Sequence, residues 1–529
     1  MWLPAFPPAS SAKLSKDAKH SYGQILKSSA LIGGSQVLSL GFRVIRTKAI
    51  AVLLGPTGVG LLGVFDGISD LTRTVAGLGI NTSGVRQIAE AAGTGDAAHL
   101  ARTVTTLRRV AFYSGAVGAL LLLILCRPVA LLTFGNDHHA GAVAMLALAV
   151  FFADVSQGQA ALVQGMRRIA DLARMNVLGA FYGTTFSIPI IYFYREQGIV
   201  PSLVCVAGMS ILTSWWYARK VRVERVALNW HELSAQMSVL LKLGVIFMLT
   251  GLMTMGTAYL VKIVLLRGSW AAPLTGIEAV GFYQAAWGLG GLFINFIVQA
   301  MGADFYPRLT AVAGDHPQCN RLVNEQAEVG LLLAVPGVIA TLTIAPLVMA
   351  LFYSAKFWPA VEILRWICLG MVLRVASWPM GFVLLAKGER KIFFWVELVS
   401  NLIYLALIWA GMKMFGLQGT GIAFFSLYVI TTIGLYLIVR RLSGFSVSEA
   451  NRKLGLLFVP LLAIVFVSWY FLPRTAVLAL GGVVTCITGI FSLKILCTLV
   501  PLERFPGPLR NLVLFFRLAS PAANDNHSA

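Results

Sequence analysis

The chain has 529 residues, of which 58% are hydrophobic and only 12% are charged, and its mean hydropathy is +0.79. A soluble globular protein carries about 25% charged residues, so this composition excludes a soluble protein and indicates a membrane protein. The net charge is +20, but Lys and Arg fall singly or in pairs between apolar runs, a pattern typical of topology signals and not of a nucleic-acid-binding surface.

Apolar runs of about 20 residues are long enough to cross about 30 Å of hydrocarbon as helices. We therefore predict an all-α, polytopic membrane protein with fourteen transmembrane helices. The predicted spans are residues 28–54, 58–80, 107–126, 140–165, 172–194, 198–217, 239–265, 278–302, 326–352, 357–386, 391–411, 416–439, 453–471 and 475–499.

Charge asymmetry sets the predicted orientation. With a cytoplasmic N-terminus, the inner segments hold 28 of the 42 Lys and Arg residues, and the outer loops hold six. Such an excess indicates that both termini are cytoplasmic. Residues 1–27, which are rich in Pro and then in Lys, are expected to be a disordered cytoplasmic tail.

Eight cations remain that no loop accounts for, and a cation at the centre of a bilayer helix costs roughly 2.5–3.5 kcal/mol on insertion scales. They are Arg43, Arg46, Lys48, Arg73, Lys262, Arg365, Arg374 and Lys494.

The first span carries three of these cations. Arg43 and Arg46 lie near its middle and three residues apart, so they share a helix face and are expected to line a polar cavity. Lys48 lies nearer the outer end, where snorkelling to the interface is an alternative.

The second span places Asp66, Asp70 and Arg73 on one stripe at i, i+4 and i+7. The stripe is either a buried structural ion pair or part of a functional site. Asp154, near the centre of the fourth span, either pairs with a cation across helices or exchanges a proton. The sequence leaves both alternatives open.

In the second half of the chain, Arg374 is the deepest cation, and Lys262 matches Lys48 in depth. Glu362 and Arg365 are expected to form an ion pair at the rim of the membrane. Lys494 is expected to snorkel to the inner interface.

A repeat relates the two halves. The stretch "TKAIAVLLGP" before Val59-Gly60 has a counterpart in "VKIVLLRGSW" before Val280-Gly281. We predict an N-terminal lobe over residues 28–225, a linker and C-terminal lobe over 226–441, and two further spans with a cytoplasmic tail over 442–529. Paired repeats of this kind place a substrate site near the midplane between them.

The stretch "LLGPTGVGLLGVF", which follows a Lys-bearing first span, together with the six, six and two arrangement of spans, resembles the polysaccharide-transporter branch of the MATE-like (MOP) superfamily, in particular Wzx-type flippases of lipid-linked oligosaccharides. The resemblance implies two six-helix lobes around a central cationic cavity that opens alternately to each side. The substrate it implies is an undecaprenyl-diphosphate-linked glycan, carried between the leaflets of a bacterial inner membrane.

The residues agree with that function. Arg and Lys side chains in a wet cleft replace water around a diphosphate, and the substrate-binding candidates are Arg43, Arg46, Lys48, Arg73, Lys262 and Arg374. The Gly-rich stretches lack the Lys-Ser/Thr of a phosphate-binding loop, so no nucleotide site is predicted. Ion coupling is then expected to involve Asp66, Asp70 or Asp154.

Two alternatives stay open: an exporter of organic cations with the same fold, and a polytopic polysaccharide polymerase or glycosyltransferase. Cationic midplane residues argue against the exporter, and short outer loops argue against the enzymes. We expect a monomer in membrane lipid with no enzymatic activity, cofactor, metal or nucleic acid. Polysaccharide polymerase or chain-length machinery is the open protein partner, and the sequence does not specify the glycan.

Overall fold

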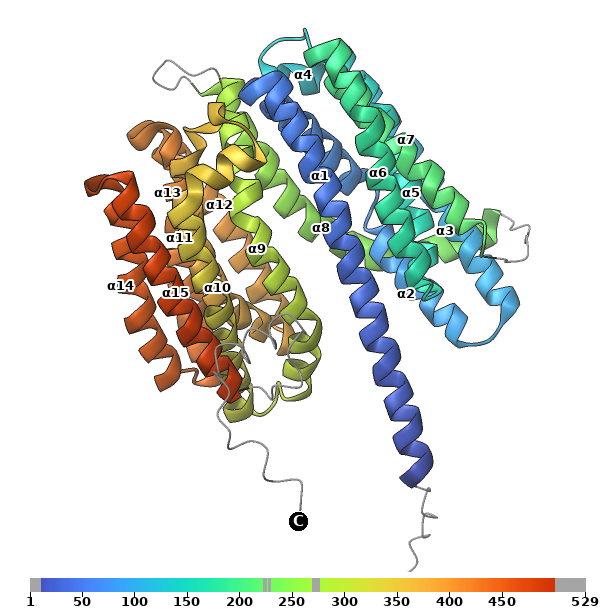
Figure 1. Ribbon diagram of the computed structural model, residues 1–529. Helices are drawn as coiled ribbons and strands as arrows, with labels where there is room; N and C mark the ends of the chain where they lie inside the picture. Colours follow the sequence, from blue (N-terminus) through green and yellow to red (C-terminus); the bar gives the residue numbers. More distant parts are fainter. Residues whose placement is uncertain (1–10, 222–225, 227–229, 269–275, 500–529) are drawn as a thin grey trace, which may run out of the picture. The chain divides into compact units, whose positions relative to one another are not determined.

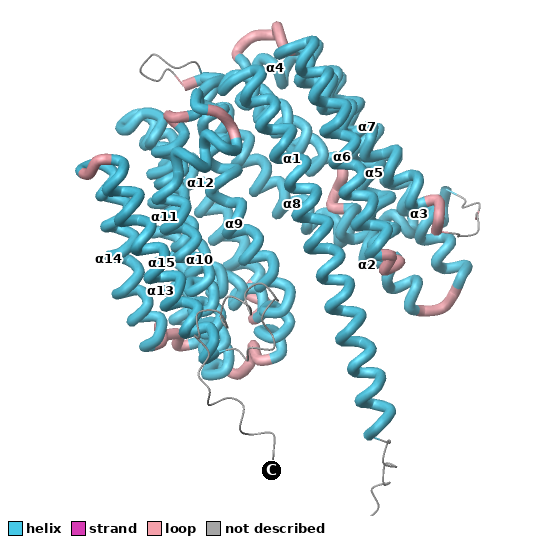
Figure 2. The backbone as a smooth tube through the Cα atoms, in the orientation of Figure 1, coloured by secondary structure: helices cyan, strands magenta, loops and turns pink. Residues whose placement is uncertain are grey.

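The computed structural model describes residues 11–221, 226, 230–268 and 276–499, and over these ranges the chain is helical with no strand (Figure 2). The helices in chain order are α1 (Ser11–Ala76), α2 (Ile80–Gly93), α3 (Ala97–Ile124), α4 (Cys126–Phe134), α5 (Ala140–Gly165), α6 (Ile169–Tyr194), α7 (Ile199–Ala218), α8 (Trp230–Arg267), α9 (Gly276–Ala311), α10 (His316–Phe352), α11 (Ala360–Ala386), α12 (Arg390–Phe415), α13 (Gly419–Ser443), α14 (Glu449–Phe471) and α15 (Arg474–Leu499). Short 3₁₀ turns lie at Arg195–Gly198, Ala355–Phe357 and Gly416–Gln418.

Each of the fourteen predicted spans falls on one of these helices, so the prediction of a polytopic all-α membrane protein is confirmed. Ten segments of the described chain are long and apolar enough to cross a membrane. Three of them, Gly34–Ala76, Ile169–Ala218 and Arg390–Ser443, each overlap two predicted spans. The short helices α2 and α4 lie between predicted spans and were not predicted.

Helix α1 contains the first two spans, joined at a kink (Figure 1). Gly55 at the kink has φ +69° and ψ −159°, a conformation that favours glycine, and Pro56 follows it. Proline fits the first turn of a helix, where its missing N–H is not needed. The "GP" of the sequence thus ends one arm of α1 and begins the next.

The N-terminal end of α1 differs from expectation. The helix begins at Ser11, so the prediction of disorder over the first 27 residues is wrong from that residue on. The segment "SAKLSKDAKHSYGQILKSS" contains Ala, Leu, Lys and Gln, which favour helix, and it continues directly into the apolar first span. Residues 1–10 and the C-terminal tail from residue 500 lie outside the described residues.

Side-chain caps mark several helix starts outside the spans. Asp96 accepts from the backbone N–H groups of Ala98 (2.8 Å) and His99 (3.1 Å), and Asp315 accepts from Gln318 (3.0 Å). The N–H groups of His99 and Ala98 lower the pKa of Asp96 because they stabilise its charged form. These caps fix where α3 and α10 begin.

The chain divides into two compact units. The first comprises Met1–Leu54 and Leu61–Tyr259, and the second comprises Gly55–Gly60 and Leu260–Ala529. A core in the first unit gathers Ile88, Leu107 and Leu162 from α2, α3 and α5. A core in the second gathers residues of α9, α10, α11 and α13, including Leu309 and Val383. The predicted lobe boundary between residues 225 and 226 stays a prediction.

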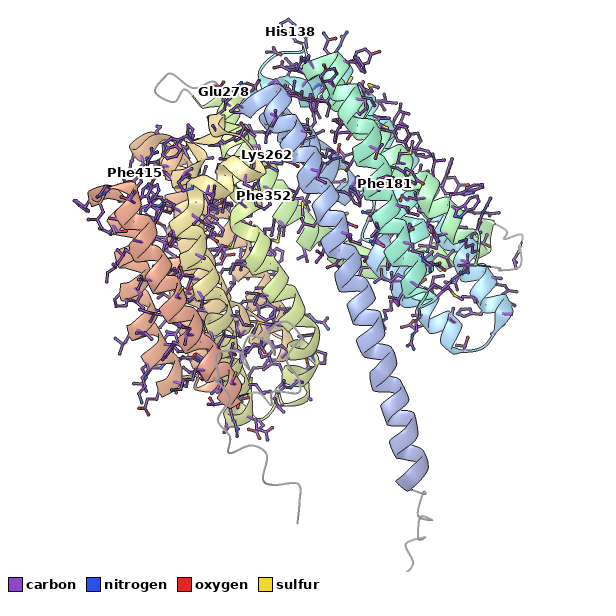
Figure 3. The ribbon with its side chains drawn as sticks, in the orientation of Figure 1. His138, Phe181, Lys262, Glu278, Phe352 and Phe415 are labelled. Carbon is purple, nitrogen blue, oxygen red and sulfur yellow. The ribbon has the colours of Figure 1, made fainter. Side chains whose placement is uncertain are left out.

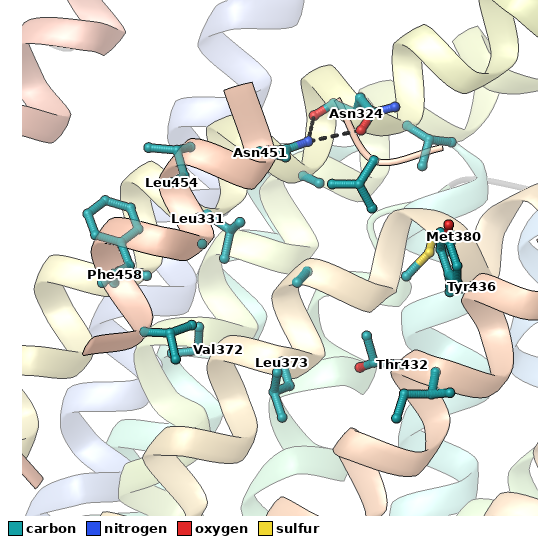
Figure 4. A pocket seen from close by; sticks show the side chains of 18 of the residues that line it. Asn324, Leu331, Val372, Leu373, Met380, Thr432, Tyr436, Asn451, Leu454 and Phe458 are labelled. Atoms are coloured by element: carbon teal, nitrogen blue, oxygen red, sulfur yellow. Dashed lines mark hydrogen bonds between the residues drawn. The ribbon is translucent and has the colours of Figure 1, made fainter. Parts of the chain in front are cut away.

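Asparagines of α10 hold the connection between α13 and α14 in the second unit. Asn320 donates to the carbonyl of Ser443 (2.7 Å), and Asn324 donates to that of Ser446 (3.0 Å). Asn451 donates to the carbonyl and side-chain oxygens of Asn324, at 2.9 and 3.1 Å. These bonds bring α14 against α10 and close one end of an apolar cavity (Figure 4).

Candidate functional site

The two arms of α1 bring cations and a carboxylate together in the first unit. Arg46 lies in the electrostatic field of Asp66 and of Arg43. On a straight helix Arg46 and Asp66 would be about 30 Å apart, so the kink at Gly55 creates this site by folding one arm beside the other.

Arg46 has a donor that is not used. Its Nε is buried and has no hydrogen-bond partner among the described residues. Arg43 is exposed, and its Nε reaches only the carbonyl of Ser39, at 3.4 Å. An unpaired guanidinium donor of this kind can donate a hydrogen bond to a phosphate oxygen.

Arg73 pairs with two carboxylates. Its Nε lies 3.4 Å from Oδ1 of Asp154, and its Nη1 lies 3.5 Å from Oδ1 of Asp70. The Asp154 side chain is 4% exposed, whereas that of Asp70 is 53% exposed. Asp154 thus pairs across helices, one of the two alternatives that the sequence left open.

The second oxygen of Asp154, Oδ2, is buried without a hydrogen-bond partner in the described part of the chain. Glycines of α3 make room for this carboxylate: a Cβ on Gly115 would lie 3.4 Å from that of Asp154, and a Cβ on Gly118 would lie 2.7 Å from that of Ala76. The absence of side chains on this face lets α1 and α5 approach α3. Oδ2 of Asp154 is thus an acceptor left unused among the described residues, next to the oxygen that faces Arg73.

The two predicted lysines differ in burial. Lys262 on α8 belongs to the second unit and is 9% exposed, so its ammonium does not reach solvent as a free surface lysine would (Figure 3). Lys48 on α1 is half-buried in the first unit.

Arg374 on α11 is the deepest predicted cation of the second unit. Its Nη1 approaches Sδ of Met371 at 3.8 Å, and it acts electrostatically on the hydroxyl of Tyr428 on α13. No carboxylate of the described residues lies within salt-bridge distance of it. Arg374 is therefore a half-buried charge that can bind an anion.

The ion pair expected between Glu362 and Arg365 is present, and its arginine is buried. The predicted partner is present, with Nη1 of Arg365 at 2.9 Å from Oε1 of Glu362, but the arginine side chain is only 1% exposed. Its guanidinium also donates to the carbonyl of Phe466 and lies over the rings of Phe466, Trp469 and Tyr470, at 4.6, 5.4 and 5.1 Å. Arg365 therefore links α11 to α14. The aromatic run "FVSWYF" in α14 was the feature of the sequence that could have indicated this contact.

The apolar cavity of Figure 4 is a different kind of space. It measures about 410 Å³ and is lined by α10, α11, α13 and α14, with Asn324, Asn451, Thr432 and Tyr436 as its polar residues. These neutral groups cannot neutralise a diphosphate. The cavity is thus separate in chemistry from the cationic candidates.

Glu397, which was not among the predicted site residues, acts electrostatically on the same tyrosine as Arg374. Glu397 on α12 acts on the same Tyr428 hydroxyl, and Asn401 lies one turn further along the helix. Glu397, Asn401 and Tyr404 follow at i, i+4 and i+7, the same stripe pattern that selected Asp66, Asp70 and Arg73. The signal was therefore present in the sequence.

Comparison with known proteins identifies the family. The family model described as "Polysaccharide biosynthesis protein" matches residues 49–362, more than half of the chain. The chain belongs to this family. Lipid III flippases of Escherichia coli (strain K12) and Shigella flexneri are each 21% identical to it over 438 residues, covering 79% of this chain and 99% of theirs.

Solved structures of low sequence identity show the same fold as this chain. The lipid II flippase MurJ in an inward closed conformation matches with a TM-score of 0.64 and 14% identity, over 89% of this chain and 99% of that one. A MATE family multidrug transporter of the MOP superfamily matches with a TM-score of 0.62 and 17% identity, over 78% and 95%. The resemblance drawn from Gly55–Gly60 is confirmed, and these relatives are transporters, not enzymes.

Proposed function

We propose that this chain is a flippase that moves an undecaprenyl-diphosphate-linked oligosaccharide from the cytoplasmic to the outer leaflet of a bacterial inner membrane. The glycan is an O-antigen or exopolysaccharide repeat unit. Membership of a polysaccharide biosynthesis family and similarity to lipid III flippases support a lipid-linked glycan as the cargo.

One observation carries the proposal: Arg46 keeps a buried guanidinium donor unused. Burying a guanidinium N–H without a hydrogen-bond partner is costly, so such a group persists where a ligand supplies the acceptor. The planar guanidinium binds two phosphate oxygens at once, and the nearby Asp66 offsets part of the cost when no substrate is bound. Arg43, Lys48, Arg73, Lys262 and Arg374 supply the remaining positive charge.

Energy for net movement comes from an ion gradient in this proposal. Asp154 is the leading coupling residue because one of its oxygens faces Arg73 and the other is buried and unpaired. Asp66 and Asp70 are the other candidates. Flipping in proteoliposomes should accelerate when a proton or sodium gradient is imposed, and no response to either gradient would remove the coupling.

The transport proposal is tested in cells. Deleting the gene should cause one diphosphate-linked oligosaccharide to accumulate on the cytoplasmic leaflet, and mass spectrometry of the extracted lipids identifies it. The wild-type gene should restore export, whereas Arg46→Gln should reduce export at least tenfold. Arg321→Gln is the control, because Arg321 is 79% exposed and pairs with Glu325 on the surface of α10.

Two results would contradict the proposal: full export by Arg46→Gln at wild-type expression, or no accumulating lipid-linked glycan in the deletion strain. Sensitivity of the deletion strain to organic cations, without a glycan phenotype, would instead indicate an exporter. A monomeric state, cytoplasmic termini and a polymerase or chain-length partner are further parts of the proposal, each open to separate measurement.

A further inference from the structure

A polar and aromatic cluster lies inside the second unit on four helices. Helix α12 contributes Glu397, Asn401 and Tyr404, and these share one stripe with the buried Ile408. The other side of α12 carries large exposed apolar residues, namely Trp395, Val399, Leu402 and Trp409. The polar stripe therefore faces the interior of the unit and not the surrounding lipid.

Hydrogen bonds order part of this cluster. The hydroxyls of Tyr283 on α9 and Tyr404 on α12 lie 3.1 Å apart. The amide of Asn401 donates to the backbone carbonyl of Glu397 at 2.8 Å and approaches its Oε1 at 3.5 Å. Among the described residues the carboxylate of Glu397 thus has a single amide as its hydrogen-bond partner, which leaves most of its acceptor capacity available.

Two opposite charges act on one hydroxyl without pairing with each other. Tyr428 on α13 is in the electrostatic field of both Arg374 and Glu397. Among the described residues neither charge has an oppositely charged group within 4.0 Å. Ionisable side chains inside a membrane protein are costly and are retained at functional sites. The separation of these two charges therefore calls for a ligand that bridges them.

An aromatic surface adjoins the charges. Trp287 on α9 stacks on Tyr283, with ring centroids 6.0 Å apart and planes at 29°, and meets Phe424 edge-on at 5.2 Å. Phe424 in turn lies 4.8 Å from Tyr428. Tyr283 and Phe424 are buried, whereas Trp287 is half-buried and presents part of its ring. The indole therefore packs against the rings of Tyr283 and Phe424.

We propose that this cluster, defined by Arg374, Glu397, Asn401, Tyr428 and Trp287, binds a neutral sugar ring of the glycan. A sugar offers hydroxyls that donate to a carboxylate and accept from a guanidinium and an amide, and its C–H face packs on an aromatic ring. The proposal rests on the flippase function given above and adds a second subsite, distinct from Arg46.

Other ligands fit less well. A metal cation would be repelled by Arg374, and no group of three His, Cys, Asp or Glu side chains gathers in the described part of the chain. A second diphosphate would be repelled by Glu397. A neutral, hydroxyl-rich ligand satisfies both charges together.

The test distinguishes binding of the sugar from binding of the diphosphate. Full-length protein in nanodiscs is titrated with undecaprenyl diphosphate and with undecaprenyl-diphosphate lipids bearing one N-acetylglucosamine, glucose or galactose, and binding is followed by native mass spectrometry. Wild type should bind at least one sugar-bearing lipid at least fivefold more tightly than the sugar-free lipid. Glu397→Gln and Tyr428→Phe, which nearly preserve shape, should lose this difference.

Leu402→Ala is the matched control, because Leu402 lies on the same helix with 57% of its surface exposed. It should keep the full difference between sugar-bearing and sugar-free lipid. The proposed subsite is contradicted if the wild type binds none of the three sugar-bearing lipids more tightly than the sugar-free lipid. It is also contradicted if both polar variants keep the wild-type preference, or if they weaken the binding of all four lipids equally. Failure of wild type to bind even the sugar-free lipid would overturn the proposed function itself.

Discussion

At the residue scale, Asp154 and Asp70 allow a direct comparison, since both pair with Arg73 but differ in burial. Asp154→Asn removes the buried carboxylate and should lower the free energy of unfolding by about 1–3 kcal/mol. It should also abolish the response of transport to an ion gradient. Thermal unfolding of purified protein and gradient-driven flipping in proteoliposomes measure the two effects.

Asp70→Asn is the control for this prediction. Its carboxylate is more than half exposed, and exposed ion pairs contribute at most about 1 kcal/mol. The variant should therefore retain stability and most gradient-driven transport. Equal effects of the two substitutions would contradict a special role for Asp154.

Arg365 gives a second prediction at this scale, and it concerns stability only. Glu362→Ala leaves the guanidinium of Arg365 buried without its carboxylate and should cost about 3 kcal/mol. Replacing both residues by Met should recover most of that loss, because apolar side chains can replace a buried ion pair at little cost. Thermal unfolding decides, and a double variant less stable than Glu362→Ala would contradict the prediction.

The sequence predicted single site residues better than their partners. Hydropathy located Arg46, Arg73 and Asp154 inside spans, because a charge in an apolar run is conspicuous. It did not pair Arg73 with Asp154, which lies 81 positions away, because that contact depends on how the helices pack. Glu397 was overlooked because it lies near the inner end of its span, where a charge needs no special explanation.

At the scale of elements, the two glycines of the predicted repeat lie against each other. A Cβ on Gly60 would lie 2.0 Å from the carbonyl oxygen of Ile277, and one on Gly281 would lie 2.0 Å from that of Pro56. Backbone therefore meets backbone where α1 crosses α9, and small residues permit this close approach. The glycines of the repeat are therefore required for the close packing of α1 against α9.

Substitution tests this crossing. Gly60→Ala or Gly281→Ala must separate the two helices, and overpacking costs typically about 1–3 kcal/mol. Each variant should therefore lower the melting temperature and the yield of folded protein. Gly208→Ala on α7 is the control, since no atom lies within 4 Å of its added Cβ. Unchanged stability of both α1 and α9 variants would contradict the contact.

Long apolar helices were predictable because crossing a bilayer demands a minimum length and hydropathy. Short connecting helices were not, since α2 and α4 have neither the length nor the apolar content of a span. The single-residue break at Gly55 was visible only as "GP" in the sequence. Its effect, the meeting of Arg46 and Asp66, depends on a backbone angle that composition does not encode.

At the scale of the whole molecule, the basic residues serve two purposes. Most of the 42 fall in predicted inner segments, where they set orientation, and a few lie within the spans. The candidates for substrate binding divide between the compact units: Arg43, Arg46, Lys48 and Arg73 in the first, Lys262 and Arg374 in the second. Each compact unit therefore contributes predicted cations of its own.

The orientation is testable in cells. In a background with all six native cysteines replaced by Ser, Asn136→Cys between α4 and α5 should react with a membrane-impermeant maleimide from the periplasmic side. Gly95→Cys between α2 and α3 should react only after the inner membrane is permeabilised, because the positive-inside asymmetry predicts that this loop is cytoplasmic. Neither substitution removes a contact within the membrane, and a Cβ at Gly95 meets no atom within 4 Å, although its φ of +73° adds local strain. Labelling of Gly95→Cys in intact spheroplasts would contradict the predicted orientation. It would also contradict the proposal that Arg46 receives its substrate from the cytoplasmic side.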